Sequence, residues 1–189
     1  RNGTRLVQFD GDMIWTEWRS FGKGWKFPEK YNREPWRGII ERNRRKTLQP
    51  KSYRWPRQKA LFGLFDMMDY IAERSEKTLA DMEGVEIGSY QGSSAEVFAS
   101  VLGELRTIDP WEYGGKKLVD AELLYYAAME RFSNVNHMKM TGDQAVDGFF
   151  DGLFDFIYID AVHEYQNVVD DINAWLPKLK PDGWLCGHD

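Results

Sequence analysis

The sequence predicts an α/β protein with a doubly wound, mainly parallel sheet. From residue 85 onward, short apolar runs alternate with stretches that have helical spacing. Several of these runs end in a glycine or an aspartate, and residues 154–159 are almost continuously apolar, which is typical of a central parallel strand. Short connections between such units favour right-handed crossovers within one sheet, which is the Rossmann-like arrangement.

The composition fits one globular domain with an appendage. The chain has 189 residues, of which 42% are hydrophobic and 15% aromatic, so it can build a core. It contains no apolar run long enough for a membrane-spanning helix, so we expect no membrane partner. Its single cysteine, Cys186, cannot form an internal disulfide, which predicts a reducing, cytoplasmic setting.

Charge divides the chain into two regions. Residues 19–59 hold 14 Lys or Arg against 3 Glu, whereas residues 60–189 hold 9 basic and 24 acidic residues. We predict an N-terminal hairpin and basic cover over residues 1–57 and a Rossmann-like core over residues 58–189. The basic residues lie beside tryptophans, so an anion-binding lid or a nucleic-acid surface is an alternative to a cover packed on the acidic core. No nucleic-acid motif accompanies the charge, which favours the cover or lid.

The N-terminal elements are sparse. Asp10-Gly11 between two β-rich runs predicts an antiparallel hairpin over residues 6–18. Poor periodicity and four prolines leave residues 20–57 with one short helix, around residues 38–46. Helical spacing returns over residues 58–76.

The first β-α unit contains a glycine turn. Residues 85–87 read as a strand, Gly88 and Gly92 bracket a polar turn, and Ser93 or Ser94 can N-cap the helix that follows. Such a turn presents backbone N–H groups to a ligand, or it is an ordinary tight turn, and this stretch alone leaves both readings open.

The second strand, residues 105–109, ends in an acid. Asp109 lies 21 residues after Gly88, close to the spacing at which a carboxylate accepts hydrogen bonds from ribose hydroxyls. A turn aspartate ahead of Pro110 is the alternative, but the glycine turn upstream favours ribose binding.

The remaining elements also end in polar residues. We predict helices over residues 120–132 and 165–176, and strands over residues 135–140, 154–159 and 184–186. Asp143 follows the third strand, where it can reach an adenine ring or simply cap a helix. Parallel strands end at the same edge, so we expect one crevice to gather the residues at the strand ends, which are Gly88, Asp109, Asp143, Asp160 and Asp189.

Five segments in this order resemble one family. They are residues 85–94, 109–111, 142–143, 154–165 and 179–189. Together they resemble the class I S-adenosylmethionine-dependent methyltransferases, specifically the methyltransferase-24 family, over about residues 83–189. The ordered set is far more specific than any one segment.

The resemblance implies a set of cofactor contacts. Glu86 and the backbone around Gly88 look like the cradle for the methionine end of S-adenosylmethionine, Asp109 like the ribose carboxylate, and Asp143 with Gln144 like the adenine contacts. The full set that we expect to bind the cofactor is Glu86, Gly88, Ser89, Gly92, Ser93, Asp109, Trp111, Asp143, Gln144 and Asp160.

The resemblance also implies a catalytic group. In metal-assisted relatives, the positions that match Asp160 and Asp189 hold a divalent ion, and the position of His163 holds a general base. This chain has His188 where those relatives carry another acid. The resemblance therefore implies Mg²⁺ or another divalent metal at this site, because imidazole ligates metals such as Mn, Fe or Zn whereas Mg²⁺ prefers oxygen ligands. The alternative for His163 is a polar loop histidine that caps the next helix. The alternative for His188 and Asp189 is a chain end that binds no metal.

We therefore predict a methyltransferase that acts on a hydroxyl group of a small molecule, such as a sugar or a natural product. The alternative is a nucleic-acid-binding protein or an RNA methyltransferase that uses the basic segment. A nicotinamide dehydrogenase is disfavoured because the glycine turn lacks the third glycine of the dinucleotide fingerprint. Family members add antiparallel strands beyond the fifth strand, and the hairpin over residues 6–18 is our candidate for them. An uncovered sheet edge there would favour a homo-oligomer.

Overall fold

The computed structural model describes residues 5–6, 29–45, 54–112 and 116–188. Contacts divide the chain into two compact units, one formed by residues 1–8 and 75–189 and the other by residues 9–74. The division falls after Arg74, whereas the sequence placed a boundary after residue 57. The reason is that the long helix α3 (Arg54–Arg74) packs with the shorter helix that precedes it.

The smaller unit is held together by aromatic packing. It contains the 3₁₀ turn η1 (Glu29–Tyr31), α2 (Trp36–Arg45) and α3. Tyr31 stacks on Phe62 with ring centroids 4.5 Å apart, and Trp36 stacks on Phe65 at 4.4 Å. All four rings are buried, so they form the core of this unit.

Acids of α3 neutralise part of the basic charge in this unit. Lys30 pairs with Asp66 at 2.9 Å, and Arg33 pairs with Asp69 at 2.6 Å. These pairs use basic residues that the sequence offered as a lid or a nucleic-acid surface. The hairpin predicted over residues 6–18 lies outside the described residues except for Leu6, and so do the side chains of Trp25 and Trp55.

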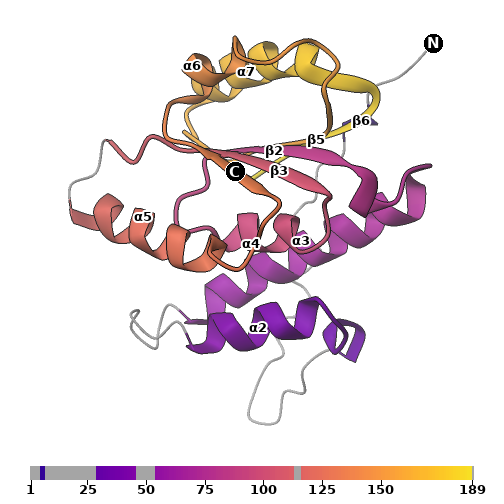
Figure 1. Ribbon diagram of the computed structural model, residues 1–189, viewed down its shortest axis with the longest axis vertical. Coiled ribbons are helices and arrows are strands. Elements are labelled where there is room, and N and C mark those ends of the chain that lie inside the picture. The colour runs from indigo at the N-terminus through magenta and orange to yellow at the C-terminus, as the bar shows by residue number, and fades with distance from the viewer. Residues whose placement is uncertain (1–4, 7–28, 46–53, 113–115, 189) are drawn as a thin grey trace. The chain divides into compact units, whose positions relative to one another are not determined.

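The larger unit contains the sheet (Figure 1). Its strands are β1 (Arg5–Leu6), β2 (Glu83–Ile87), β3 (Glu104–Ile108), β4 (Val135–Met138), β5 (Phe154–Ile159) and β6 (Leu179–Gly187). Their order is β1-β6-β5-β2-β3-β4, and every neighbouring pair is parallel. The chain builds outward from β2 through β3 to β4 and then returns to place β5 on the other side of β2. This topological switch point between β2 and β5 confirms the predicted doubly wound fold.

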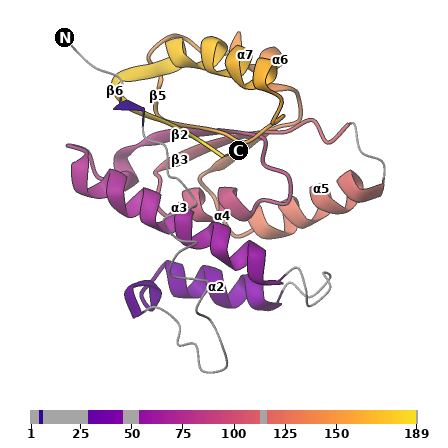
Figure 2. The same cartoon turned by 180° about the vertical axis from the view of Figure 1, so that it is seen from behind.

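Helices cover both faces of the sheet. α4 (Ser93–Ala99) and α5 (Lys116–Met129) lie on one face, and α6 (Gly142–Val146) and α7 (Tyr165–Trp175) lie on the other (Figures 1 and 2). The short 3₁₀ turns η3 (Leu79–Asp81) and η4 (Leu176–Lys178) precede β2 and β6. Strand residues alternate between the two faces, so Ile87 joins the core with Trp175, whereas Tyr158 contacts Phe98 of α4.

Two local predictions needed correction. Ser93 and Ser94 do not cap α4: Gly92 does, in a left-handed conformation with φ of 73°, and Ser93 is the first helical residue. β6 begins at Leu179 rather than residue 184. The pairing shifts between Phe154 and Phe156, so residues 180–183 form an irregular stretch inside the strand.

The edge of the sheet beside β6 is covered by β1. Arg5 and Leu6 pair in parallel with Trp184 and Leu185. The sequence proposed an antiparallel hairpin for this edge, but residues 7–18 lie outside the described ones, so the hairpin stays a prediction. Within the described part of the chain, no helix has both the length and the apolar character needed to cross a bilayer.

A buried ion-pair network fastens the start of β5. Asp155 is 6% exposed and accepts hydrogen bonds from Lys77 at 2.6 Å, from Lys180 at 2.8 Å and from the backbone N–H of Glu83 at 3.0 Å. Burial opposes ionisation of this carboxyl group, but the hydrogen bonds from Lys180 and Lys77 outweigh it and hold its pKa below the ordinary value. Asp155 thus ties β5 to the segment before β2 and to the irregular stretch of β6.

We expect Asp155→Ala to lower the free energy of unfolding by about 2 kcal/mol at neutral pH, because three donors lose their acceptor while both lysines remain partly hydrated. The lowered pKa means that this contribution is present above the ordinary pKa of an aspartate and is lost as the pH falls through the folded value. Urea denaturation measures both effects. Asp151→Ala, at an exposed ion pair with Lys178, is the control and should cost less than about 0.5 kcal/mol.

Candidate functional site

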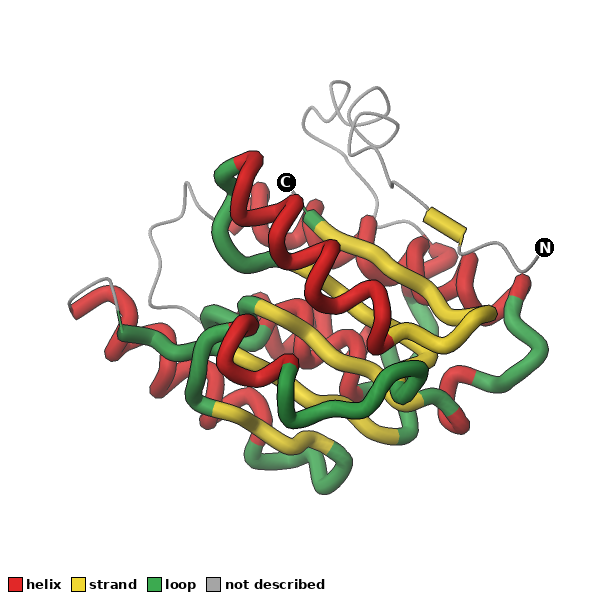
Figure 3. The backbone as a smooth tube through the Cα atoms, turned by 90° about the horizontal axis from the view of Figure 1, so that it is seen from above, coloured by secondary structure: helices red, strands yellow, loops and turns green. Residues whose placement is uncertain are grey.

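The strands lie side by side in one sheet (Figure 3), and backbone hydrogen bonds connect several of the residues that follow them. The backbone N–H of Gly88 donates to the carbonyl of Ile108 at 2.8 Å, and that of Asp160 donates to Ile87 at 2.8 Å. The N–H of His188 donates to Ile159 at 3.0 Å. Each bond extends the hydrogen-bonding pattern of the sheet by one residue, so these positions are as well fixed as the strands themselves.

Gly88 sits at the switch point, in contact with the end of β5. Its φ is 89°, and a Cβ at this position would lie 2.2 Å from the carbonyl oxygen of Asp160. A side chain therefore fits neither the backbone conformation nor the space. Glycine here lets the turn after β2 approach Asp160 directly.

Asp109 organises the glycine turn. Its Oδ2 accepts hydrogen bonds from the backbone N–H groups of Ser89 at 3.0 Å and Tyr90 at 2.8 Å, and its Oδ1 accepts one from the N–H of Trp111 at 2.9 Å. The indole Nε1 of Trp111 donates to the carbonyl of Tyr90 at 2.8 Å, which closes the network. Oδ1 keeps acceptor capacity for one more donor, as a ribose-binding carboxylate requires.

Two residues of this network have unusual backbones. Tyr90 has a φ of 44° and Trp111 a φ of 48°, which residues other than glycine seldom adopt. Such strain is typical of functional sites, where surrounding contacts hold it in place. The Trp111 ring is 6% exposed and packs on Tyr125 and His137, so its two N–H groups, rather than its ring face, shape the site.

Glu86 is a buried carboxyl group without a partner. The side chain is completely buried, and neither of its oxygens has a hydrogen-bond partner among the described residues. Burial raises its pKa to about 8, while nearby hydroxyl groups of Ser94 and Ser89 offset part of this rise. The hydroxyl oxygens of Ser89 and Ser93 are also buried and unpartnered. Unpaired buried groups are costly, so this concentration indicates a place where a polar ligand binds.

The predicted adenine contacts lie at the start of α6. Asp143 and Gln144 are exposed, and Gln144 Oε1 accepts a hydrogen bond from the backbone N–H of Thr141 at 3.1 Å. Gln144 therefore caps the helix. A Cβ on Gly142 would lie 2.9 Å from Ile87, which places Asp143 close to the end of β2.

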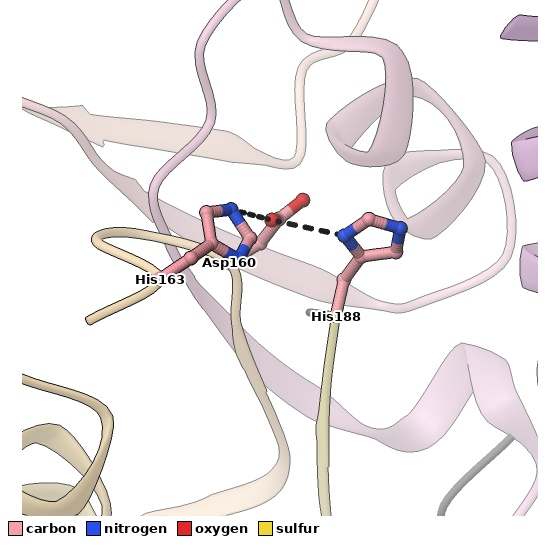
Figure 4. A group of neighbouring side chains, drawn as sticks. All are labelled: Asp160, His163 and His188. Carbon is pink, nitrogen blue, oxygen red and sulfur yellow. Dashed lines mark ion pairs between the residues drawn. The ribbon is translucent and has the colours of Figure 1, made fainter. Parts of the chain in front are cut away.

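Asp160, His163 and His188 form a cluster at the ends of β5 and β6 (Figure 4). His163 Nε2 lies 3.4 Å and His188 Nδ1 lies 3.6 Å from the same oxygen, Asp160 Oδ1. One potential ligand atom from each residue lies within 4.8 Å of the others. The predicted metal ligands Asp160 and His188 are thus brought together, and His163, predicted as a base, joins them. The predicted ligand Asp189 lies outside the described residues.

Sequence reasoning missed two residues of the site. Tyr90 acts through its backbone N–H and carbonyl, which carry no residue-type signal. Tyr158 is buried opposite Glu86 in the pairing of β2 and β5, and its only signal was its place in an apolar strand. The sequence predicted Glu86 as a cofactor contact but did not predict that its carboxyl group is completely buried.

Comparison with known proteins agrees with the fold and identifies the family. Methyltransf_24, the model of a methyltransferase domain, matches residues 85–189, which is more than half of the chain. Two curated relatives are uncharacterised proteins. One is y4gI of Sinorhizobium fredii, 27% identical over 117 residues, and the other is R132 of Acanthamoeba polyphaga mimivirus, 28% identical over 134 residues. The matches cover 56% and 66% of this chain but only 13% and 58% of those proteins.

Solved structures show the same fold. A putative methyltransferase from Bacillus halodurans superposes with a TM-score of 0.51 at 20% identity, covering 65% of this chain and 48% of that one. A tRNA (m1A58) methyltransferase from Aquifex aeolicus gives 0.50 at 15% identity, covering 75% and 49%. The matched family and the parallel, doubly wound sheet lead to one conclusion. The chain belongs to the methyltransferase-24 family of class I S-adenosylmethionine-dependent methyltransferases.

Proposed function

We propose that this protein transfers the methyl group of S-adenosylmethionine to a hydroxyl group of a small molecule, such as a sugar or a natural product. The observation that carries the proposal is the contact between Gly88 and Asp160. This contact brings the turn that follows Glu86 next to Asp160, which belongs to the cluster with His163 and His188. One end of the edge thus has the groups that a charged nucleoside needs, and the other has groups that can remove a proton.

The residues of the turn fit the cofactor. The methionine end of S-adenosylmethionine carries an ammonium group and a carboxylate. Glu86 is suited to accept hydrogen bonds from the ammonium, and the unpartnered hydroxyls of Ser89 and Ser93 are suited to donate to the carboxylate. Asp109 Oδ1 has room to accept a ribose hydroxyl, and the exposed Asp143 is available to the adenine amino group.

Methyl transfer needs alignment and removal of a proton. The acceptor oxygen attacks the methyl carbon as the carbon–sulfur bond breaks, the sulfonium becomes a neutral thioether, and the hydroxyl proton leaves. In the ion-free protein His163 is placed to accept that proton, and the carboxylate of Asp160, 3.4 Å away, stabilises the resulting imidazolium. A divalent ion held by Asp160 and His188 would lower the pKa of a hydroxyl that it binds.

The test is an assay with methyl-¹³C-labelled S-adenosylmethionine and a panel of sugars, phenols and other small hydroxylated molecules. We expect S-adenosylhomocysteine and a product whose labelled carbon has the NMR shift of a methyl ether. His163→Gln should lower kcat by at least about 100-fold and leave the Kd of S-adenosylhomocysteine unchanged. A product methylated on nitrogen or carbon, or failure to bind S-adenosylhomocysteine in calorimetry, would contradict the proposal.

A further inference from the structure

The cluster of Asp160, His163 and His188 has the distances of shared metal ligands rather than of hydrogen bonds. Contacts of 3.4 and 3.6 Å between nitrogen and oxygen are too long for good hydrogen bonds. Ligands bound about 2.0–2.2 Å from one ion at tetrahedral angles lie roughly 3.4 Å from each other. The two distances to Asp160 are close to that spacing and converge on one carboxylate oxygen, and the potential ligand atoms of all three residues lie within 4.8 Å of one another.

The sheet holds the backbone at two of the three residues. Asp160 and His188 follow the neighbouring strands β5 and β6, and the N–H of His188 is bonded to the carbonyl of Ile159 at 3.0 Å. His163 comes from the loop before α7, and the side chains of His163 and His188 are 46% and 56% exposed, so both rings have room to turn. A carboxylate at the end of a central strand with two adjustable imidazoles is an arrangement that can close around an ion.

We propose that Asp160, His163 and His188 bind a single first-row transition-metal ion, of the kind that accepts imidazole, in preference to Mg²⁺. Two nitrogen donors and one oxygen donor suit Zn²⁺, Fe²⁺ or Co²⁺, whereas Mg²⁺ demands oxygen ligands in near-ideal octahedral geometry. Three protein ligands leave at least one position open, which is the feature of catalytic rather than structural sites.

This inference changes the role of His163 in methyl transfer, and its meaning for catalysis rests on the proposed function. With an ion bound, His163 is a ligand, and its role as a proton acceptor is confined to the ion-free protein. The open position would then be available to the acceptor hydroxyl. A base alone would leave metal affinity unaffected when it is replaced, whereas a ligand would not.

Metal titrations of the tag-free, chelator-treated full chain test the site. We expect one equivalent of Zn²⁺ in calorimetry, with a Kd at least about 100-fold lower than that of Mg²⁺, and visible absorption bands when Co²⁺ is added. His163→Gln and His188→Gln should each weaken Zn²⁺ binding by about 100-fold or more. The matched control is Glu164→Gln, which removes an exposed charge beside the cluster without removing a donor, and it should change the Kd less than about threefold.

The inference would be overturned by a failure to bind Zn²⁺, by Mg²⁺ binding as tightly as Zn²⁺, or by Zn²⁺ binding that survives both histidine substitutions. His137→Gln checks for binding elsewhere, because His137 is the third of the chain's three histidines. Titration of the same variants with S-adenosylhomocysteine separates this inference from the proposed function. If the nucleoside binds and Zn²⁺ does not, the metal site is wrong while the cofactor proposal stands. If Zn²⁺ binds and the nucleoside does not, the reverse holds.

Discussion

Glu86→Gln is expected to weaken the binding of S-adenosylhomocysteine by about 100-fold, because the amide loses the charge that would pair with the ligand's ammonium group in a buried position. Calorimetry measures this change. Adenosine, which lacks the ammonium group, serves as the control ligand and should bind the variant and the parent protein equally well.

The pH dependence of binding gives the same prediction a second test. The pKa of Glu86 is about 8 in the ligand-free protein, so the carboxyl group is mostly neutral at pH 6.5 and must lose a proton to pair with the ammonium. Affinity for S-adenosylhomocysteine should therefore rise by roughly 20-fold between pH 6.5 and 8.5 and stay flat in Glu86→Gln. Equal pH profiles for the two proteins would show that Glu86 does not contact the cofactor.

The free energy of unfolding should fall over the pH range in which the affinity for S-adenosylhomocysteine rises. The folded state holds a proton on Glu86 that the unfolded state loses above its ordinary pKa, so the free energy of unfolding falls as the pH rises from about 4.5 to 8. Glu86→Gln removes this loss and should stabilise the ligand-free protein at pH 8 by on the order of 3 kcal/mol. A residue kept for stability alone would not show that gain.

Asp109→Asn is expected to raise the Kd of S-adenosylhomocysteine by roughly 100-fold, and that of adenosine by a similar factor. The carboxylate accepts three backbone N–H bonds, from Ser89, Tyr90 and Trp111. An amide has one oxygen, so its NH₂ group must face at least one of these donors, and the turn loses both a bond and its charge. Because the defect lies at the ribose end, adenosine should report it as well.

Asp147→Asn is the control for Asp109→Asn. Asp147 is exposed at the end of α6 and has no role in the proposed cofactor site, so replacing it should change the Kd of adenosine by less than about threefold. If adenosine binds Asp109→Asn as well as the parent protein, Asp109 does not hold the ribose, and its role is limited to the conformation of the turn.

The sequence was sufficient to predict the sheet and the edge where the site lies. Apolar periodicity gave the central strands, and parallel topology then required Gly88, Asp109 and Asp160 to meet at the same edge. These predictions depend on the local pattern and on chain direction, both of which a single sequence carries.

Side-chain partnerships were not predictable in the same way. The bond between the Trp111 indole and the Tyr90 carbonyl spans 21 residues, and the pairing of Asp155 with Lys77 spans 78. Neither follows from spacing. The N-cap of α4 was predicted from residue type as Ser93 or Ser94, but the left-handed residue Gly92 is the N-cap, so the helix starts earlier, at Ser93. Likewise, the approach of His163 to the oxygen that faces His188 depends on a loop conformation.

The close approach of Gly88 to Asp160 has a consequence for timing. The turn that is suited to hold the nucleoside is in direct contact with the backbone carbonyl of Asp160, and even a methyl group would not fit between them. A shift of the glycine turn should displace Asp160, so binding of the nucleoside should change the affinity for the acceptor. By thermodynamic linkage, the acceptor should change the affinity for the nucleoside by the same factor. An enzyme arranged in this way would position the methyl donor and the acceptor relative to each other as one rigid unit.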